Sequence, residues 1–220
     1  MRVIPASGAN ALSVAEYVIT SAMLLLRGAY ASSAAVAAGQ WPRNALGNGR
    51  ETAGKTLGII GFGSIGQLTA RLARGLGMQV IAFDAMLHAD AAAYRDNDVT
   101  FAPLQDLVLQ ADVITLHVPL VDGTRGLFDA GRIASMKPGA ILINTSRGHI
   151  VNLEAVASAL RLGHLGGAAI DVFDAEPVVT TDFLVNCPNL LLTPHISGVS
   201  LESNERVSFL IAEKVLEALH

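Results

Sequence analysis

The chain has 220 residues, enough for one sizeable domain or for one domain and part of another. Charged residues make up 15% and hydrophobic residues 51%, so we expect a large core together with either an oligomer interface or a surface left bare by a missing partner segment. The net charge of −4 comes without any block of basic residues, which argues against nucleic acid as a partner.

The first part of the chain is predicted to be helical. Residues 11–38 have the spacing of one long helix or of two abutting helices, with Asn10 or Ser13 as the candidate N-cap. Residues 39–54 contain a Trp-Pro pair and a Gly-Asn-Gly run, which are typical of a connecting loop. Alternating strand and helix patterns follow, as in a parallel sheet that is covered by helices on both faces.

A glycine-rich turn is the most informative motif of the chain. An apolar run at 56–60 predicts a strand, and apolar residues at helical spacing predict a helix over 65–76. Gly63 removes the Cβ that would block a pyrophosphate, and Gly66 lets the helix pack close to the sheet. The helix N-terminus adds unpaired N–H groups and a positive dipole end. The candidate cofactor-binding residues of this turn are Gly61, Gly63, Ser64, Ile65 and Gly66.

Asp84 completes a dinucleotide-binding pattern. It follows a second apolar run, the strand predicted at 78–83, and lies eighteen positions after Gly66. We expect its carboxylate to accept hydrogen bonds from ribose hydroxyls. A tight strand-to-helix turn without a ligand is the alternative interpretation of the glycines, and the acid at this spacing counts against it. No arginine adjoins Asp84, so the pattern favours NAD over NADP, whose 2′-phosphate the carboxylate would repel.

The remainder of the chain extends the alternation. Strands are predicted at 112–117, 139–144, 167–171 and 190–192, and helices at 104–110, 129–135, 153–162 and 201–219. The expected fold class is therefore α/β, a doubly wound parallel-sheet Rossmann domain. Ligands of such sheets bind beyond the carboxyl ends of the strands. Four polar segments meet that description: 117–120, 144–148, 171–177 and 193–195.

Three side chains in those segments suggest a reaction. The guanidinium of Arg147 can hold a carboxylate through two hydrogen bonds and polarise a neighbouring carbonyl. A carboxylate at Glu176 beside His195 would favour the imidazolium, which can protonate a ketone oxygen while hydride arrives at carbon. Taken singly, the arginine could pair with a surface acid, the glutamate could be solvated and the histidine could cap a helix. Asp171 could equally cap a turn or accept hydrogen bonds from a nicotinamide carboxamide.

Other residue types limit the chemistry. Cys187 is the only cysteine, which excludes an intrachain disulfide and a site built from several thiolates. The six histidines show no metal-ligand spacing, so we expect no structural metal. Residues 1–5 lack the apolar core of a signal peptide, and residues 12–26 are too few and too polar to span a bilayer. We therefore expect a cytoplasmic protein that does not enter the membrane.

Four motifs resemble those of the NAD-dependent D-isomer-specific 2-hydroxyacid dehydrogenases, in order along the chain. They are Gly61-Phe-Gly-Ser-Ile-Gly66 with Asp84, Ile143-Asn-Thr-Ser-Arg-Gly148, Asp171-Val-Phe-Asp-Ala-Glu-Pro177 and Thr193-Pro-His195. The resemblance implies an oxidoreductase that transfers a hydride between NAD(H) and a small 2-hydroxy or 2-oxo acid, acting on the CH–OH group. It implies that Arg147 binds the 2-oxo acid, that His195 is the acid/base and that Glu176 is its partner. The implied cofactor groove comprises His117, Val118, Pro119, Thr124, Thr145, Ser146, Asp171, His195 and Gly198.

The resemblance also implies an organisation. In this family the nucleotide domain is inserted into a separate substrate domain. We therefore expect residues 1–10 to be a remnant of the substrate domain, 11–194 to be the NAD-binding domain and 195–220 to return to the substrate domain. Family members usually dimerise through the nucleotide domain, which makes residues 11–38 and the loop around Trp41 the candidate homodimer interface. Packing within one chain is the alternative for Trp41.

Two functional hypotheses follow. In the first, the chain is a 2-hydroxyacid dehydrogenase that retains its cofactor and catalytic residues. In the second, it is a catalytically impaired, NAD-binding and dimer-forming fragment that lacks most of the substrate domain. Binding of NADH without its oxidation by a 2-oxo acid would select the second. Nucleic-acid corepressors share this fold, but the charge distribution does not favour that class.

Overall fold

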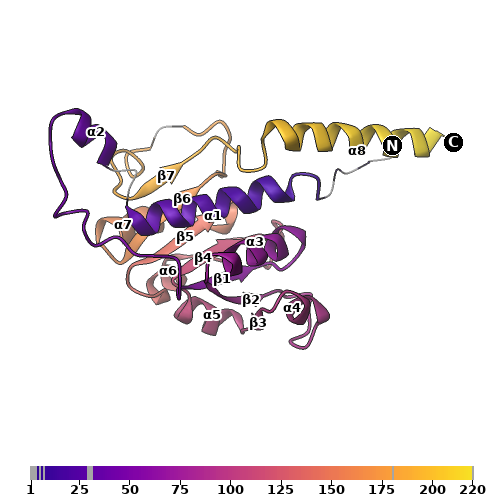
Figure 1. The fold of residues 1–220 in the computed structure, drawn as a ribbon, viewed down its shortest axis with the longest axis horizontal. Helices are drawn as coiled ribbons and strands as arrows, with labels where there is room; N and C mark the ends of the chain where they lie inside the picture. The colour runs from indigo at the N-terminus through magenta and orange to yellow at the C-terminus, as the bar shows by residue number, and fades with distance from the viewer. Residues whose placement is uncertain (1–3, 5, 7, 29–31, 180, 220) are drawn as a thin grey trace.

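The computed structural model describes residues 4, 6, 8–28, 32–179 and 181–219. Its centre is a seven-stranded sheet in the order β3-β2-β1-β4-β5-β6-β7, and every neighbouring pair is parallel. The strands are β1 (Thr56–Ile60), β2 (Gln79–Phe83), β3 (Thr100–Phe101), β4 (Val113–Leu116), β5 (Ala140–Asn144), β6 (Leu165–Ile170) and β7 (Leu190–Leu192). Figure 1 shows these strands side by side, with helices around them.

Helices connect the strands and cover both faces of the sheet, which confirms the expected doubly wound α/β fold. They are α1 (Ala11–Arg27), α2 (Ser32–Ala37), α3 (Ser64–Gly75), α4 (Ala92–Asp96), α5 (Leu104–Gln110), α6 (Ala130–Ser135), α7 (Leu153–Arg161) and α8 (Leu201–Leu219), with a short 3-10 turn, η2 (Gly148–Ile150).

The period-2 alternation of the strands divides the core into two layers. Leu57 and Ile59 of β1 face α1 and α3, whereas Ile60 faces the layer made by α5, α6 and α7. The same alternation runs along β5, where Ile141 and Leu142 lie in opposite layers. Each fully buried Leu or Ile side chain stabilises the fold by about 1.5–3 kcal/mol. Packing on both faces holds the strands in place, and with them the polar segments that follow the carboxyl ends of the strands.

The strand order places the glycine-rich turn at a topological switch point. The chain moves from β1 outward to β2 and β3, then returns to β4 on the other side of β1. A Cβ added to Gly61 would overlap the backbone carbonyl of His117, which follows β4. The turn after β1 and the turn after β4 therefore touch, and the crevice between such turns is where sheets of this type bind their ligands.

The predicted elements agree with the structure to within a residue or two, with a few differences. Of the two alternatives predicted for residues 11–38, the structure shows the second, with the helices α1 and α2. Asn10 occupies the N-cap position of α1, but its side chain makes no capping hydrogen bond; its amide lies against Gly198 instead. The segment 39–54 contains no helix or strand, as predicted. The substrate-domain remnant expected at 1–10 falls partly on residues outside the described ranges.

Among the described residues, three short elements were not predicted: α4, β3 and η2. Each has five residues or fewer, too short for an apolar period to show. Tyr94 of α4 is buried and stacks on Phe62 with ring centroids 5.1 Å apart, so this region closes the core beside the glycine-rich turn.

The last helix differs from the others in its surroundings. Figure 1 shows α8, in yellow, extending beyond the sheet. Ser203 is the only one of its described residues that is buried, and Leu201 and Phe209 are 82% and 70% exposed. Within the described ranges, no helix combines the length and apolarity needed to cross a bilayer.

Candidate active site

The glycine-rich turn is fixed by close backbone approaches. Gly61 has φ 92°, a left-handed conformation that side chains disfavour, and its N–H donates to the Phe83 carbonyl at 2.8 Å. A Cβ at Gly66 would overlap the Gly61 carbonyl, so α3 can begin this close to β1 only with glycine there. At Gly63, by contrast, an added Cβ would have no other atom within 4 Å, so this side of the turn is open. Its open side, followed by Ser64 at the start of α3, leaves room for a phosphate.

Asp84 ties the end of β2 to this turn. One carboxylate oxygen accepts the Phe62 N–H at 2.7 Å, and the other accepts the Met86 N–H at 2.8 Å. Burial, and then the negative charge of Asp84, raise the pKa of the neighbouring Tyr94. Each carboxylate oxygen keeps a further lone pair, so these bonds do not prevent the ribose contact expected at Asp84.

The turn after β4 lies against the glycine-rich turn. His117 Nε2 lies 3.1 Å from Thr115 Oγ1. Burial of the ring disfavours its charged form and lowers the pKa of His117 to about 3. The ring is therefore neutral at pH 7. Thr124 closes the turn, because its hydroxyl accepts the Val121 N–H at 2.9 Å and donates to the Pro119 carbonyl at 2.6 Å.

The segment after β5 is organised by its own polar groups. Asn144 is buried; its amide donates to the Arg147 carbonyl at 2.9 Å and accepts the Ser146 N–H at 3.0 Å. The Ser146 hydroxyl donates to the Leu116 carbonyl and so joins this segment to β4. The Thr145 hydroxyl is buried and has no hydrogen-bond partner among the described residues. A buried hydroxyl without a partner costs about 1–3 kcal/mol, so a polar ligand atom here would be stabilising.

Arg147, Glu176 and His195 come together from three segments. His195 Nδ1 lies 2.7 Å from Glu176 Oε2, and Glu176 Oε1 accepts the Phe173 N–H at 2.9 Å. The hydrogen bond from His195, followed by that from the Phe173 N–H, lowers the pKa of Glu176. With Arg147, the pair lines a cavity of about 210 Å³. The sequence-based expectation that these three side chains meet agrees with this geometry.

A close approach at Gly148 makes this meeting possible. A Cβ at Gly148 would overlap the backbone of Phe173 and Asp174, so only glycine lets the segment after β5 lie against the segment after β6. The same cavity is also lined by His149 and Asp174, whose Nδ1 and Oδ1 atoms are 3.6 Å apart. Neither was singled out from the sequence, because an exposed pair in a loop carries no pattern.

Asp171 is fully buried and caps the turn that carries His195. Its carboxylate accepts the Thr193 hydroxyl at 2.6 Å and the Ile196 and Ser197 N–H groups at 2.8 Å. Its backbone carbonyl accepts the His195 N–H at 2.9 Å. Of the two roles considered for Asp171, the structure shows the turn cap. A contact with the nicotinamide carboxamide stays a prediction, as do cofactor contacts of Gly198, whose missing Cβ leaves room for α1.

The residues along this edge fit a dinucleotide. The open side of Gly63 at the start of α3 suits a pyrophosphate, the Asp84 carboxylate suits a ribose, and the unpartnered Thr145 hydroxyl suits a polar group between the two halves of the edge.

Comparison with known proteins gives the same assignment. Residues 19–197 match the profile described as "D-isomer specific 2-hydroxyacid dehydrogenase, NAD binding domain". The chain is 50% identical over 217 residues to an (S)-sulfolactate dehydrogenase of Chromohalobacter salexigens, covering 99% of this chain and 70% of that protein. It is 39% identical over 212 residues to a D-3-phosphoglycerate dehydrogenase of Haemophilus influenzae, covering 94% of this chain and half of that protein.

A solved structure supports the cofactor as well. A Staphylococcus aureus NAD-dependent formate dehydrogenase in complex with NAD superimposes with a TM-score of 0.86 at 33% identity, covering 96% of this chain and 62% of that one. The cofactor of the domain is NAD, as the motif at Gly61–Gly66 with Asp84 predicts. The chain belongs to the family of D-isomer specific 2-hydroxyacid dehydrogenases, and residues 19–197 match its NAD-binding domain.

Proposed function

We propose that the protein is an oxidoreductase that transfers a hydride between NAD(H) and a small 2-hydroxy or 2-oxo acid, at the CH–OH group. The observation that carries this proposal is the 2.7 Å contact between His195 and Glu176 in the cavity that Arg147 also lines. It supports a site where one group binds a carboxylate and another exchanges a proton, next to the predicted cofactor groove.

Each side chain has a distinct role in this proposal. Arg147 donates one N–H to the Ser146 carbonyl at 2.6 Å, which directs the guanidinium, and its other N–H groups are available for the substrate carboxylate. Glu176 holds the Nδ1 proton of His195, which leaves Nε2 to donate its proton to the carbonyl oxygen during reduction and to accept it back during oxidation. Bound NADH supplies the hydride.

The His195→Gln variant tests the proposal. Glutamine cannot act as the acid, so we expect reduction of the 2-oxo acid to be abolished. The Kd for NADH, measured by fluorescence enhancement, should stay within about threefold, because His195 is only one of the many residues of the predicted cofactor groove. An equal loss of turnover and of NADH binding would assign His195 a structural role.

The alternative is an NAD-binding module that does not turn over. The chain spans half the length of one curated relative and 70% of another, so the activity of these residues needs its own assay. NADH oxidation would be followed with pyruvate, glyoxylate and hydroxypyruvate, alongside NADH fluorescence. The name of the Chromohalobacter relative adds sulfopyruvate, the 2-oxo acid that corresponds to sulfolactate. Binding without oxidation of NADH by any of the four would select the module.

We also propose that residues 11–194 form the nucleotide domain and that residues 1–10 and 195–220 belong to a substrate domain. The exposed apolar side chains Leu201 and Phe209 support this division, because a domain packed on α8 would cover them. Limited proteolysis would test it: cleavage near residue 195 that releases α8 and leaves a folded, NADH-binding core would agree, and loss of the whole fold would not.

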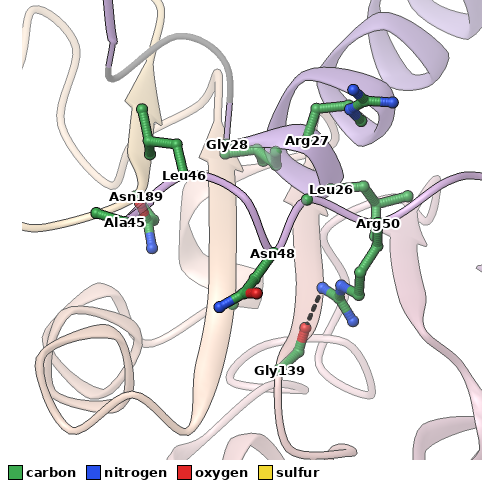
Figure 2. A pocket seen from close by; sticks show the side chains of 12 residues that line it. Leu26, Arg27, Gly28, Ala45, Leu46, Asn48, Arg50, Gly139 and Asn189 are labelled. Atoms are coloured by element: carbon green, nitrogen blue, oxygen red, sulfur yellow. Dashed lines mark hydrogen bonds between the residues drawn. The ribbon is translucent and has the colours of Figure 1, made fainter. Parts of the chain in front are cut away.

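A homodimer through α1, α2 and the segment around Trp41 is the proposed assembly. Trp41 is 78% exposed and no residue of α2 is buried. The same connecting segment lines a hollow of about 390 Å³ together with Arg27 at the end of α1. Figure 2 shows Asn48 at this hollow and Arg50 donating to the Gly139 carbonyl. A segment that carries an exposed aromatic side chain and lines a hollow suits a second copy.

Sedimentation velocity would test the dimer. We expect Trp41→Ala to shift the protein toward the monomer, whereas Leu162→Ala, which removes an equally exposed apolar side chain after α7, should leave the dimer intact. A Trp41→Ala variant that sediments like the original protein would place the interface elsewhere. We further propose a cytoplasmic location, because the reaction draws on the nicotinamide pool of the cell; cell fractionation tests this.

A further inference from the structure

The turn that carries His195 is held from two sides. On one side, the buried Asp171 binds the Thr193 hydroxyl and the backbone N–H groups of residues 196 and 197. On the other side lies α1, where Tyr17 Oη is 2.6 Å from Thr193 Oγ1. Tyr17 is therefore connected to the His195 turn through one shared hydroxyl, although 178 positions separate it from His195 in the sequence (195 − 17).

The direction of these two hydrogen bonds follows from proton counting. A threonine hydroxyl has a single proton, and Thr193 donates it to Asp171, whose carboxylate oxygen accepts. The Tyr17 hydroxyl must then donate its own proton to Thr193. Burial raises the pKa of Tyr17, which keeps that proton in place. The three side chains form a directed chain, Tyr17 to Thr193 to Asp171.

The backbone at His195 requires such support. His195 has φ 57°, in the left-handed region, where a residue with a side chain persists only when its surroundings hold it. Its own N–H donates to the backbone carbonyl of Asp171, so a shift of the turn around Asp171 moves His195 directly. Glu176 lies on a different segment, and a small displacement of the turn would lengthen the 2.7 Å contact between the two side chains.

We propose that Tyr17 is a positioning residue, which holds His195 against Glu176 by donating a hydrogen bond to Thr193 and thereby fixing the turn around Asp171. This inference rests on the proposed function of His195 as the acid/base. Tyr17 does not line the catalytic cavity, and it acts through Thr193.

The neighbouring bond on the same helix provides a matched control. One helical turn before Tyr17, Ser13 Oγ lies 3.1 Å from Ser200 Oγ, so this bond also joins α1 to the chain after His195. Ser200 follows the turn and caps the start of α8, where its hydroxyl accepts the Ser203 N–H at 3.0 Å. Loss of the Ser13 bond weakens the docking of α1 without touching Thr193 or Asp171.

Steady-state kinetics with NADH and an active 2-oxo acid form the first test, on the whole chain. We expect Tyr17→Phe to lower kcat about tenfold, since small misplacements of a catalytic group have large effects on rate, while the KM for NADH stays within about twofold. Ser13→Ala should change kcat by less than about twofold. Equal effects of the two variants, or a Tyr17→Phe loss confined to the KM for NADH, would overturn the proposal.

A double-mutant cycle tests the route through Thr193. Thr193→Val removes the shared hydroxyl, so adding Tyr17→Phe to it should lower kcat no further, whereas independent effects would multiply. Thr193→Ser keeps the hydroxyl and should restore most of the rate, which also covers the case in which the valine variant fails to fold. A Thr193→Ser variant as slow as Tyr17→Phe would contradict the proposal that Tyr17 acts through Thr193. So would effects of Tyr17→Phe and Thr193→Val on kcat that multiply.

An experiment without turnover separates this inference from the proposed function. Amide hydrogen exchange of residues 195–197 reports the turn directly, and we expect it to be about tenfold faster in Tyr17→Phe than in Ser13→Ala. If the original chain binds NADH but reduces no 2-oxo acid, the proposed function fails while this exchange difference still supports the positioning role. Identical exchange in the two variants would end the proposal, whatever the activity.

Discussion

The two halves of the sheet edge are held in place by different means. Around β1 and β2, the nucleotide half is shaped by backbone packing, with Gly61 and Gly66 allowing approaches that a Cβ would block. Around β5, β6 and β7, the catalytic half is shaped by buried polar side chains: Asn144 binds the backbone of the turn that follows it, and Asp171 binds the backbone of the turn after β7. The nucleotide half therefore depends mainly on close backbone approaches, which the Asp84 carboxylate supplements. The catalytic half depends mainly on buried hydrogen-bonding side chains, together with the close approach at Gly148.

This difference matters for function. A cofactor that binds many proteins of one fold needs a standard cradle, and glycines at fixed spacing provide it. A proton-transfer site needs a few side chains placed within a fraction of an ångström, and a saturated buried carboxylate provides the rigidity. The two halves should accordingly respond differently to substitution.

The largest effect is expected at Asp171. Asp171→Ala leaves three donors of the His195 turn without their buried acceptor, so we expect the free energy of unfolding to fall by about 3–5 kcal/mol. Urea unfolding measures it. The exposed Asp174→Ala is the control, with an expected change within about 0.5 kcal/mol. Similar changes in the two variants would mean that the buried carboxylate does not organise the catalytic half.

Next in size is Arg147→Lys. An ammonium cannot reproduce the two-pronged contact with a carboxylate, so we expect kcat/KM for the 2-oxo acid to fall about 100-fold with NADH binding unchanged. Arg161→Lys, on the exposed end of α7, should have little effect on either quantity. Near-normal turnover in Arg147→Lys would remove this residue from the substrate site.

The pH dependence tests the pair of His195 and Glu176. The hydrogen bond from His195 lowers the pKa of Glu176 below its ordinary 4.5, so the carboxylate is still ionised at pH 4.5. The stability that Glu176 contributes is therefore present above pH 4.5 and is lost only as the pH falls through the lowered pKa.

In Glu176→Gln this charge is absent. We expect reduction to slow about tenfold at pH 7, because Nδ1 of His195 loses the carboxylate that accepts its proton and orients the ring. The rate of reduction is compared with that of the original protein at pH 7. An unchanged rate would show that Glu176 does not hold the proton of His195.

The smallest effect is expected in the nucleotide half. Asp84→Ala removes a ribose partner and a charge that repels a 2′-phosphate, so we expect the preference for NADH over NADPH to fall about tenfold. Isothermal titration with both cofactors measures this. A preference that does not change would show that Asp84 serves only the turn, through the bonds to Phe62 and Met86.

The same contrast explains what could be predicted from the sequence. Apolar runs and glycine spacing act locally, so the strands β1 to β7, apart from the two-residue β3, and the site of the nucleotide turn were predictable. Turn capping was one of two roles predicted for Asp171, but its partners were not predictable, because they lie 22 to 26 positions away and meet it only in the folded sheet. The same holds for Tyr17, which is one aromatic residue in an apolar helix until the fold brings it to Thr193.

At the N-cap of α1, the local sequence pattern predicts the position but not the contact of the side chain. Asn10 has the residue type of a cap, and it occupies that position, but its side chain packs against Gly198 instead of capping the helix. A tertiary contact of this kind leaves no trace in the local sequence. Long-range contacts thus decide the details of both halves, but only the nucleotide half also has a local sequence motif from which its position can be predicted.

Isotope transfer tests the central claim most directly. The protein would be mixed with NADH deuterated at the transferring C4 position and with a 2-oxo acid, and the product examined by NMR. We expect deuterium to appear at C2 of the 2-hydroxy acid. In the His195→Gln variant we expect no deuterium at C2, although this variant still binds the cofactor. Saturating NADH binding with no deuterium at C2 for any of the four 2-oxo acids would contradict it.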